Sequence, residues 1–181
     1  MYELRRATAA DAAALRVLIE SSVRTLSEGF YTRAQIDSAL LYVFGPDTQL
    51  IADGTYYVVE GDDGTLIAAG GWSRRRTLYG GDQMKDAADP LIDPRIEPAR
   101  IRAFYVHPRW ARRGLGRQLL ARCEADAEAA GFETLELMST LPGVPLYHAA
   151  GFHEIERLAP VLPDGVTLPV VRMRRALHRP A

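Results

Sequence analysis

Hydrophobic and polar residues along the first part of the chain follow the patterns of one strand and two helices. Residues 2–7 form a short extended run. The next segment places apolar residues on one helical face, behind a start signal made by Thr8 and Asp11. A second helix is expected over 32–41, with Thr32 as its N-cap. The chain is therefore predicted to open as strand, helix, helix.

Two β-rich runs follow, and a turn joins them. Residues 55–60 (TYYVVE) and 66–73 (LIAAGGWS) flank the sequence GDDG, which is typical of a hairpin. Residues 77–98 have no sustained period of 2 or 3.6 residues, and they contain two adjacent glycines and three prolines. Long loops inside a compact domain tend to be functional or disordered. We therefore mark 77–98 as a candidate loop that faces a substrate.

The second half of the chain predicts a strand-helix-strand crossover. Residues 101–106 have the pattern of a strand, 116–130 that of a helix, and 134–138 that of a further strand. Strands joined through a helix pair in parallel, whereas hairpin strands pair antiparallel. A short helix at 144–150 and strands at 152–157 and 167–173 complete the chain. The order β-α-α-β-β-β-α-β-α-β-β describes an α/β domain with a mixed sheet.

Composition limits the kinds of protein this chain can be. Its 181 residues are 48% hydrophobic and 25% charged, which suits a single domain over residues 1–181 with one core. Twenty-two basic residues nearly balance 23 acidic ones, so neither nucleic acid nor an anionic membrane is expected as the main partner. Cys123 is the only cysteine, and no apolar run approaches the length of a membrane span. We expect a soluble cytoplasmic protein.

One stretch, Trp110 to Leu120 (WARRGLGRQLL), places glycines and arginines where an extended run turns into a helix. The first N–H groups of a helix lack internal partners and carry about half a positive charge, so they bind phosphate. Gly114 and Gly116 permit close approach of a ligand oxygen, and Arg112, Arg113 and Arg117 add charge around them. The stretch therefore predicts a pyrophosphate site.

Two common phosphate-binding motifs do not fit this stretch. A dinucleotide-binding fingerprint needs a third glycine, and Leu119 stands in its place. A P-loop needs Gly-Lys-Ser/Thr, and the only lysine of the chain is the distant Lys85. A Rossmann-type oxidoreductase is therefore only a remote possibility.

The segment VHPRWARRGLGRQLL, preceded by a strand and followed later by LYHAAGF, resembles the GNAT superfamily of acyl-CoA-dependent N-acetyltransferases. The order of elements matches over nearly the whole chain, and 101–152 matches most specifically. The resemblance implies a mixed, mostly antiparallel central sheet flanked by helices, with one parallel strand-helix-strand crossover. Ala111 stands at the Gln/Arg position of the family pattern, and Pro142 stands where many members have asparagine.

The resemblance also implies which residues would bind acetyl-CoA. The pyrophosphate would be held by the backbone amides of the turn, from residues Arg112, Arg113, Gly114, Leu115, Gly116 and Arg117. The pantetheine arm would pair with the backbone of Phe104, Tyr105 and Val106. These strand residues also suit a core strand, and both interpretations can hold because pairing uses the main chain while alternate side chains pack.

Two catalytic roles follow from the same resemblance. The Val106 N–H would donate to the oxyanion that develops during acyl transfer, and Tyr147 would be the general acid that protonates the departing thiolate. The alternative for Tyr147 is an aromatic core residue beside Phe152.

The general base stays open. Many family members have a glutamate near the start of the crossover strand, but that place falls near Arg100 here. Glu97, Asp93, Asp82 or a water chain are the alternatives, and His107 fits a structural turn equally well. Cys123 has apolar neighbours at helical spacing, so we expect it to pack in the core, which leaves direct acetyl transfer without an acyl-enzyme. The histidines lack metal-ligand spacing, and no metal is expected.

The functional hypothesis is an acetyl-CoA-dependent N-acetyltransferase that acts on a primary amine of unknown identity, in a small molecule or a peptide. The alternative is a catalytically silent acyl-CoA sensor or partner-docking module, and a homodimer is possible. In this superfamily the variable segments, here 22–53 and 77–98, set the acceptor. The acids of the second segment would suit a cationic, polyamine-like acceptor, although a solvated acidic loop is the simpler interpretation; they are Asp82, Asp86, Asp89, Asp93 and Glu97.

Overall fold

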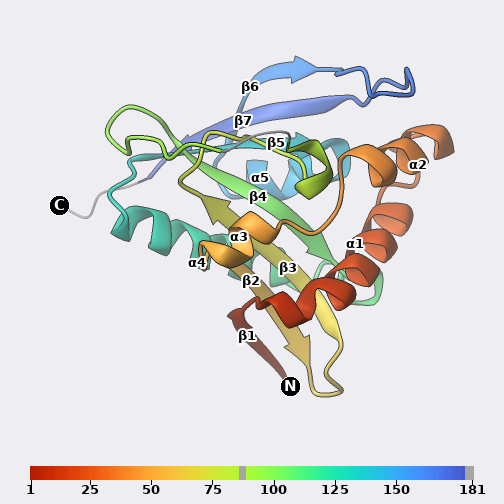
Figure 1. Cartoon of the computed structure of the whole chain (residues 1–181), viewed down its shortest axis with the longest axis horizontal. Coiled ribbons are helices and arrows are strands. Elements are labelled where there is room, and N and C mark those ends of the chain that lie inside the picture. The colour runs from red at the N-terminus through yellow and green to blue at the C-terminus, as the bar shows by residue number, and fades with distance from the viewer. Residues whose placement is uncertain (86–88, 178–181) are drawn as a thin grey trace.

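A seven-stranded sheet in the order β1-β2-β3-β4-β5-β7-β6 forms the centre of the molecule (Figure 1). The structure is a computed structural model and describes residues 1–85 and 89–177. The strands are β1 (Tyr2–Arg6), β2 (Tyr56–Gly61), β3 (Leu66–Ser73), β4 (Ala99–Val106), β5 (Thr134–Thr140), β6 (His153–Leu158) and β7 (Val170–Ala176). Only β4 and β5 pair in parallel; the other neighbours are antiparallel. The predicted mixed, mostly antiparallel sheet with one parallel crossover is confirmed.

Helices cover both faces of the sheet. They are α1 (Ala12–Leu26), α2 (Arg33–Tyr42), α3 (Thr48–Ala52), α4 (Leu115–Ala129) and α5 (Val144–Ala149). On one face, Leu15 and Leu18 of α1 share a buried cluster with Val58 of β2. On the other face, Leu119 of α4 shares a second cluster with Leu137 of β5. No helix in the described part of the chain is long and apolar enough to cross a membrane.

Most predicted elements lie within one or two residues of their observed bounds. One strand is shifted further, and one short helix was not predicted. The predicted last strand, 167–173, is present but begins and ends three residues later, because β7 spans Val170–Ala176. The Leu168 N–H donates instead to the Pro160 carbonyl at 3.0 Å, which closes a turn, and Pro169 has no N–H to give a ladder. The short helix α3 was not predicted. It begins after Asp47, whose carboxylate accepts from the Leu50 N–H at 3.2 Å.

The predicted start signals of the first two helices are both present. Thr32 accepts from the Gln35 N–H at 3.2 Å, and the Gln35 side chain accepts from the Thr32 N–H at 3.0 Å. The Asp11 carboxylate accepts from the Thr8 N–H at 2.7 Å and forms a bidentate pair with Arg5, at 2.8 and 2.9 Å. The Arg5 guanidinium and these N–H bonds lower the pKa of Asp11 to about 2, against partial burial, which opposes the shift.

We expect Asp11→Asn to lower the free energy of unfolding at pH 7 by roughly 1–2 kcal/mol, because it removes a charge that the native state stabilises. The native pKa lies below the ordinary 3.8, so this contribution is fully present above about pH 4 and is lost as the pH falls toward 2. Urea unfolding at pH 7 and pH 3 should therefore show a smaller difference between the variant and wild type at pH 3. Glu3→Gln, on an exposed position of β1, is the matched control and should change little at either pH.

Candidate active site

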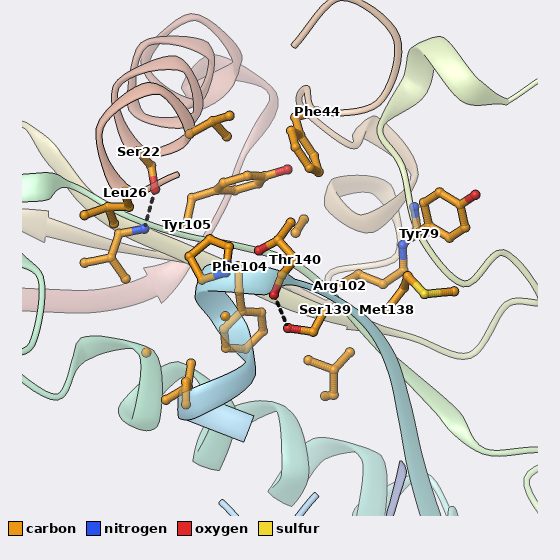
Figure 2. Close-up of a pocket in the computed structure, with 18 of the residues that line it drawn as sticks. Ser22, Leu26, Phe44, Tyr79, Arg102, Phe104, Tyr105, Met138, Ser139 and Thr140 are labelled. Carbon is orange, nitrogen blue, oxygen red and sulfur yellow. Dashed lines mark hydrogen bonds between the residues drawn. The ribbon is translucent and has the colours of Figure 1, made fainter. Parts of the chain in front are cut away.

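The two parallel strands at the middle of the sheet separate soon after they meet. Their pairing consists of Ala99 with Leu135 and Arg100 with Glu136. Beyond these pairs, both strands line a cleft of about 230 Å³, which also takes walls from α1, α5 and residues 78–81 (Figure 2). The cleft therefore occupies the gap between β4 and β5, with different elements on the two faces of the sheet.

A bulge in β4 shapes the wall of this cleft. Ala103 has a φ of 57°, and the register against β3 shifts between Ala69 and Gly71. Gly70 lies opposite the bulge, and a Cβ there would come within 2.8 Å of the Phe104 ring, so the close approach requires glycine. After the bulge, Tyr105 packs on the α1 face while Phe104 packs on the α4 face.

The Val106 N–H points into the gap between the strands. The N–H of the next residue, His107, donates to the Ile67 carbonyl at 2.8 Å, beside β3. Because successive N–H groups of a strand point to opposite sides, that of Val106 faces away from β3. It donates to the Ser22 hydroxyl of α1 at 3.2 Å (Figure 2). The sequence analysis missed Ser22, since no motif links a helix residue to a strand 84 positions away.

The glycine-arginine turn forms the start of α4, as predicted. Gly114 is the N-cap residue, exposed, with a φ of 85°, and Arg112 is also left-handed, with a φ of 65°. Gly116 is buried against α5, where an added Cβ would lie 3.1 Å from Leu146. The Arg113 guanidinium stacks on the Trp110 ring at 4.9 Å. Gly116 also lines the cleft, so the helix start and the gap between the strands adjoin each other.

Tyr147 of α5 lies at the same end of the cleft. Its ring makes edge contacts with Phe104, at 6.2 Å between centroids, and with Phe152, at 5.7 Å. Its side chain is 7% exposed, and burial raises the pKa of the phenol well above its usual range. Among the described residues, its hydroxyl has no hydrogen-bond partner. Tyr147 is therefore both a core aromatic residue and a protonated hydroxyl at the cleft.

A second tyrosine holds the segment that leads into α5. The Tyr31 hydroxyl donates to the Pro169 carbonyl at 2.6 Å and accepts from the Leu141 N–H at 2.9 Å. Burial raises the pKa of Tyr31 to about 12, so both bonds persist at neutral pH. The bond to Leu141 fixes the start of the turn before Tyr147.

None of the carboxylates considered as general base lines the cleft. Asp82 accepts from the Thr48 N–H at 3.0 Å, and Asp93 pairs with Arg95 at 2.9 Å. Glu97 pairs at 3.3 Å with Arg100, which also contacts the buried Glu136 at 3.1 Å. The residue at the family's glutamate position therefore belongs to an ion pair of the sheet.

His107 and Cys123 both have structural roles. The His107 ring nitrogen accepts from the Arg109 N–H at 3.2 Å, which caps the turn after β4 and matches the structural interpretation. Cys123 is fully buried, and burial raises the pKa of its thiol well above the usual range, so it packs in the core as expected. No group of three metal-ligating side chains occurs in residues 1–85 and 89–177.

Comparisons with known proteins agree with this architecture. A GCN5-related N-acetyltransferase from Rhodopseudomonas palustris has a TM-score of 0.70 and 19% identity, covering 97% of this chain and 95% of that one. PaiA N-acetyltransferase from Thermoplasma acidophilum, solved with coenzyme A, has a TM-score of 0.64 and 14% identity, covering 97% and 99%. The yncA protein of Salmonella typhimurium, solved with acetyl-CoA, has a TM-score of 0.61 and 20% identity, covering 100% and 96%.

These identities are low, so the structural likenesses show the fold alone. No curated protein sequence matches the chain. The model of the Acetyltransferase (GNAT) family matches residues 20–152, which is well over half of the sequence. The chain therefore belongs to the GNAT family of acetyltransferases, enzymes that transfer an acetyl group to an amine nitrogen.

Proposed function

We propose that this protein transfers the acetyl group of acetyl-CoA directly to a primary amine. The observation that carries the proposal is that the start of α4, with its exposed arginines, adjoins the cleft between the separated strands β4 and β5. Gly116 and Tyr147 line the cleft where the two meet. Two proteins of the same fold were solved with coenzyme A or acetyl-CoA, which supports this choice of acetyl donor.

The residues of the helix start fit a pyrophosphate. The exposed Gly114 has no Cβ to block an incoming oxygen, and an added Cβ there would have open space around it. Arg112, Arg113 and Arg117 are exposed around the turn. The amides of residues 112–117 would therefore hold the diphosphate, and the backbone of residues 104–106 would pair with the pantetheine arm. Bound acetyl-CoA supplies a thioester carbonyl to the cleft.

Charge development at that carbonyl favours the Val106 N–H as donor. In the structure this N–H donates to the neutral Ser22 hydroxyl. A hydrogen bond to an oxyanion is about twice as strong as one between neutral groups, so the N–H would bind the developing charge more tightly than it binds the hydroxyl. Ser22 thus keeps a buried donor satisfied until the reaction needs it.

The proton balance assigns Tyr147 a role. A neutral amine forms the new C–N bond, and its nitrogen then loses one proton to water. The C–S bond breaks as the thiolate takes one proton from the Tyr147 phenol, which regains a proton from water before the next turnover. Among the hydroxyl groups that line the cleft, that of Tyr147 has the position of the family's general acid and stays protonated, because burial raises its pKa. Its raised pKa makes complete proton release unfavourable, so the proton would pass as the C–S bond breaks.

Further parts of the proposal concern the whole chain. We propose one acetyltransferase domain over residues 1–181, working in the cytoplasm on a small molecule or a peptide, with a homodimer as a possible assembly. Neither nucleic acid nor a membrane is expected as a partner, because the charges nearly cancel.

Calorimetry and thiol release together test the function. We expect CoA and acetyl-CoA to bind with micromolar dissociation constants, and free thiol to appear when acetyl-CoA meets a suitable amine. No binding at millimolar CoA would contradict the proposal, because the residues assigned to CoA binding would then have no ligand. Tight CoA binding without thiol release over a broad panel of amines would instead support the silent sensor module.

A further inference from the structure

The cleft has a second end, on the face of the sheet covered by α1. This end, called here the acceptor end, is lined by Leu26, Phe44, Leu78, Tyr79, Tyr105 and Met138. Phe44 and Tyr105 meet edge to face, with ring centroids 6.3 Å apart. Figure 2 shows these two rings beside α1, with Tyr79 across the cleft from them. The walls of the acceptor end are therefore mostly apolar and aromatic.

Negative charge is absent from the described lining of the whole cleft. No aspartate, glutamate, histidine or lysine of residues 1–85 and 89–177 lines it. Three of the acids that suggested a polyamine-like acceptor, Asp82, Asp93 and Glu97, bond outside the cleft. Asp89 accepts from the Thr77 N–H at 2.8 Å and lies 4.0 Å from the Arg102 guanidinium, and Asp86 lies outside the described residues. That weak expectation therefore has no support in the described lining.

The charged side chain that does line the acceptor end is a cation. Arg102 is 4% exposed and pairs with two carboxylates, those of Asp47 at 2.8 Å and Asp89 at 4.0 Å. Its guanidinium also donates to the carbonyls of Thr77 and Gly80, which ties the loop that carries Tyr79 to the sheet. Asp47 is fully buried and also contacts Lys85, so its charge is shared between two cations. The carboxylates near the acceptor end are thus paired with cations and do not line the cleft, so a cationic amine would find no free carboxylate there.

The lack of a general base in the described lining also favours an amine that is uncharged near neutral pH. A lysine-like amine, with a pKa of about 10.4, is neutral in only about one molecule in 2,500 at pH 7, whereas an arylamine with a pKa below 6 is almost wholly neutral. Without a carboxylate, histidine or lysine in the described lining to accept a proton from the amine, the nitrogen has to lose its proton before it enters. Aromatic rings can attract cations when desolvated, but no carboxylate of the described lining adds to that attraction.

We propose that the acceptor is a small amine with an aromatic body, which enters the apolar end of the cleft with its nitrogen uncharged. This inference rests on the proposed acetyltransferase function and specifies its substrate class. The ring would pack against Phe44 and Tyr105, and the nitrogen would point toward the gap where β4 exposes its N–H groups.

A panel of amines tests this class of substrate. We would measure thiol release with acetyl-CoA and 4-methylaniline, phenethylamine, spermidine or an alanyl peptide from pH 6 to 9.5. We expect kcat/KM for the ring amines to exceed that for spermidine and the peptide by at least 10²-fold. The profile should be flat for 4-methylaniline and should rise tenfold per pH unit for phenethylamine below its own pKa.

Several results would overturn the inference. Preferred turnover of spermidine or the peptide would refute the substrate class while supporting the acetyltransferase. If kcat/KM fell at low pH with the same apparent pKa for both ring amines, the group that titrates would belong to the enzyme. That result would reveal a general base and refute the entry of an uncharged nitrogen. Failure to turn over either ring amine refutes the inference, and failure to bind CoA in calorimetry refutes the proposed function as well.

Variants at the acceptor end give a second test. Phe44→Ala should lower kcat/KM for phenethylamine at least tenfold, mainly through KM, with CoA affinity unchanged. Phe30→Ala is the matched control, because Phe30 is 51% exposed and lies outside the cleft. Leu78→Glu should raise kcat/KM for spermidine about tenfold over Leu78→Gln, which has the same shape without the charge. Equal values for these two variants, or no effect of Phe44→Ala, would contradict the placement of the acceptor.

Discussion

Gly114→Asp is expected to weaken CoA binding by more than 10²-fold. The substitution places a carboxylate at the start of α4, where the diphosphate would lie, so that two negative charges compete for the same N–H groups. Gly114 is exposed with a φ of 85°, and an added Cβ meets nothing within 4 Å. The left-handed backbone adds strain to any side chain at this position, but no neighbouring atom has to move, so the main loss should be one of affinity. Isothermal titration calorimetry with CoA measures it.

Two controls separate charge from backbone strain. Gly165 has nearly the same backbone, with a φ of 83° and nothing within 4 Å, but lies in the loop between β6 and β7. Gly165→Asp should show a similar loss of stability with unchanged CoA affinity. Gly114→Asn has the shape of the aspartate without its charge and should weaken binding less. If folded Gly114→Asp binds CoA like wild type, the assignment of the phosphate site is wrong.

Tyr147→Phe should lower kcat by roughly 10²- to 10⁴-fold with little change in CoA affinity. The substitution keeps the ring and its contacts with Phe104 and Phe152, and removes the proton that the residue could give to the thiolate. The hydroxyl has no partner in the described residues, so its loss should cost little stability. Steady-state kinetics with a turned-over amine, together with thermal melting, test this expectation.

Tyr42→Phe is the matched control for the hydroxyl, since Tyr42 ends α2 and does not line the cleft. A Tyr147→Phe variant with kcat within a few-fold of wild type would show that water or another group protonates the thiolate. Burial raises the pKa of Tyr147 above its usual 10, so the phenol stays protonated through that pH. A loss of activity between pH 8 and 10 should therefore persist in the variant, because it would come from a different group.

The sequence alone predicted the order of most elements and the glycine-arginine turn at the start of α4. These features depend on neighbouring residues, because a helix start needs its cap within three positions and a hairpin needs its turn. Each helix start that was predicted depends on residues close together in the sequence: Thr8 with Asp11, Thr32 with Gln35, and Gly114. The missed α3 and the shifted β7 occurred where short, weak signals compete with tertiary contacts, such as the bond from the Leu168 N–H to Pro160.

The tertiary structure decided which residues share the cleft. Ser22 reaches Val106 from a helix 84 positions earlier, and Arg102 of β4 pairs with Asp47 at the start of α3. The bulge at Ala103 then sets which side chains of β4 face the acceptor. The sequence showed many acids in 77–98 but not that several were bound in caps and ion pairs away from the cleft. Local patterns thus determined how a phosphate would be held, whereas contacts between distant segments decided the polarity of the acceptor end.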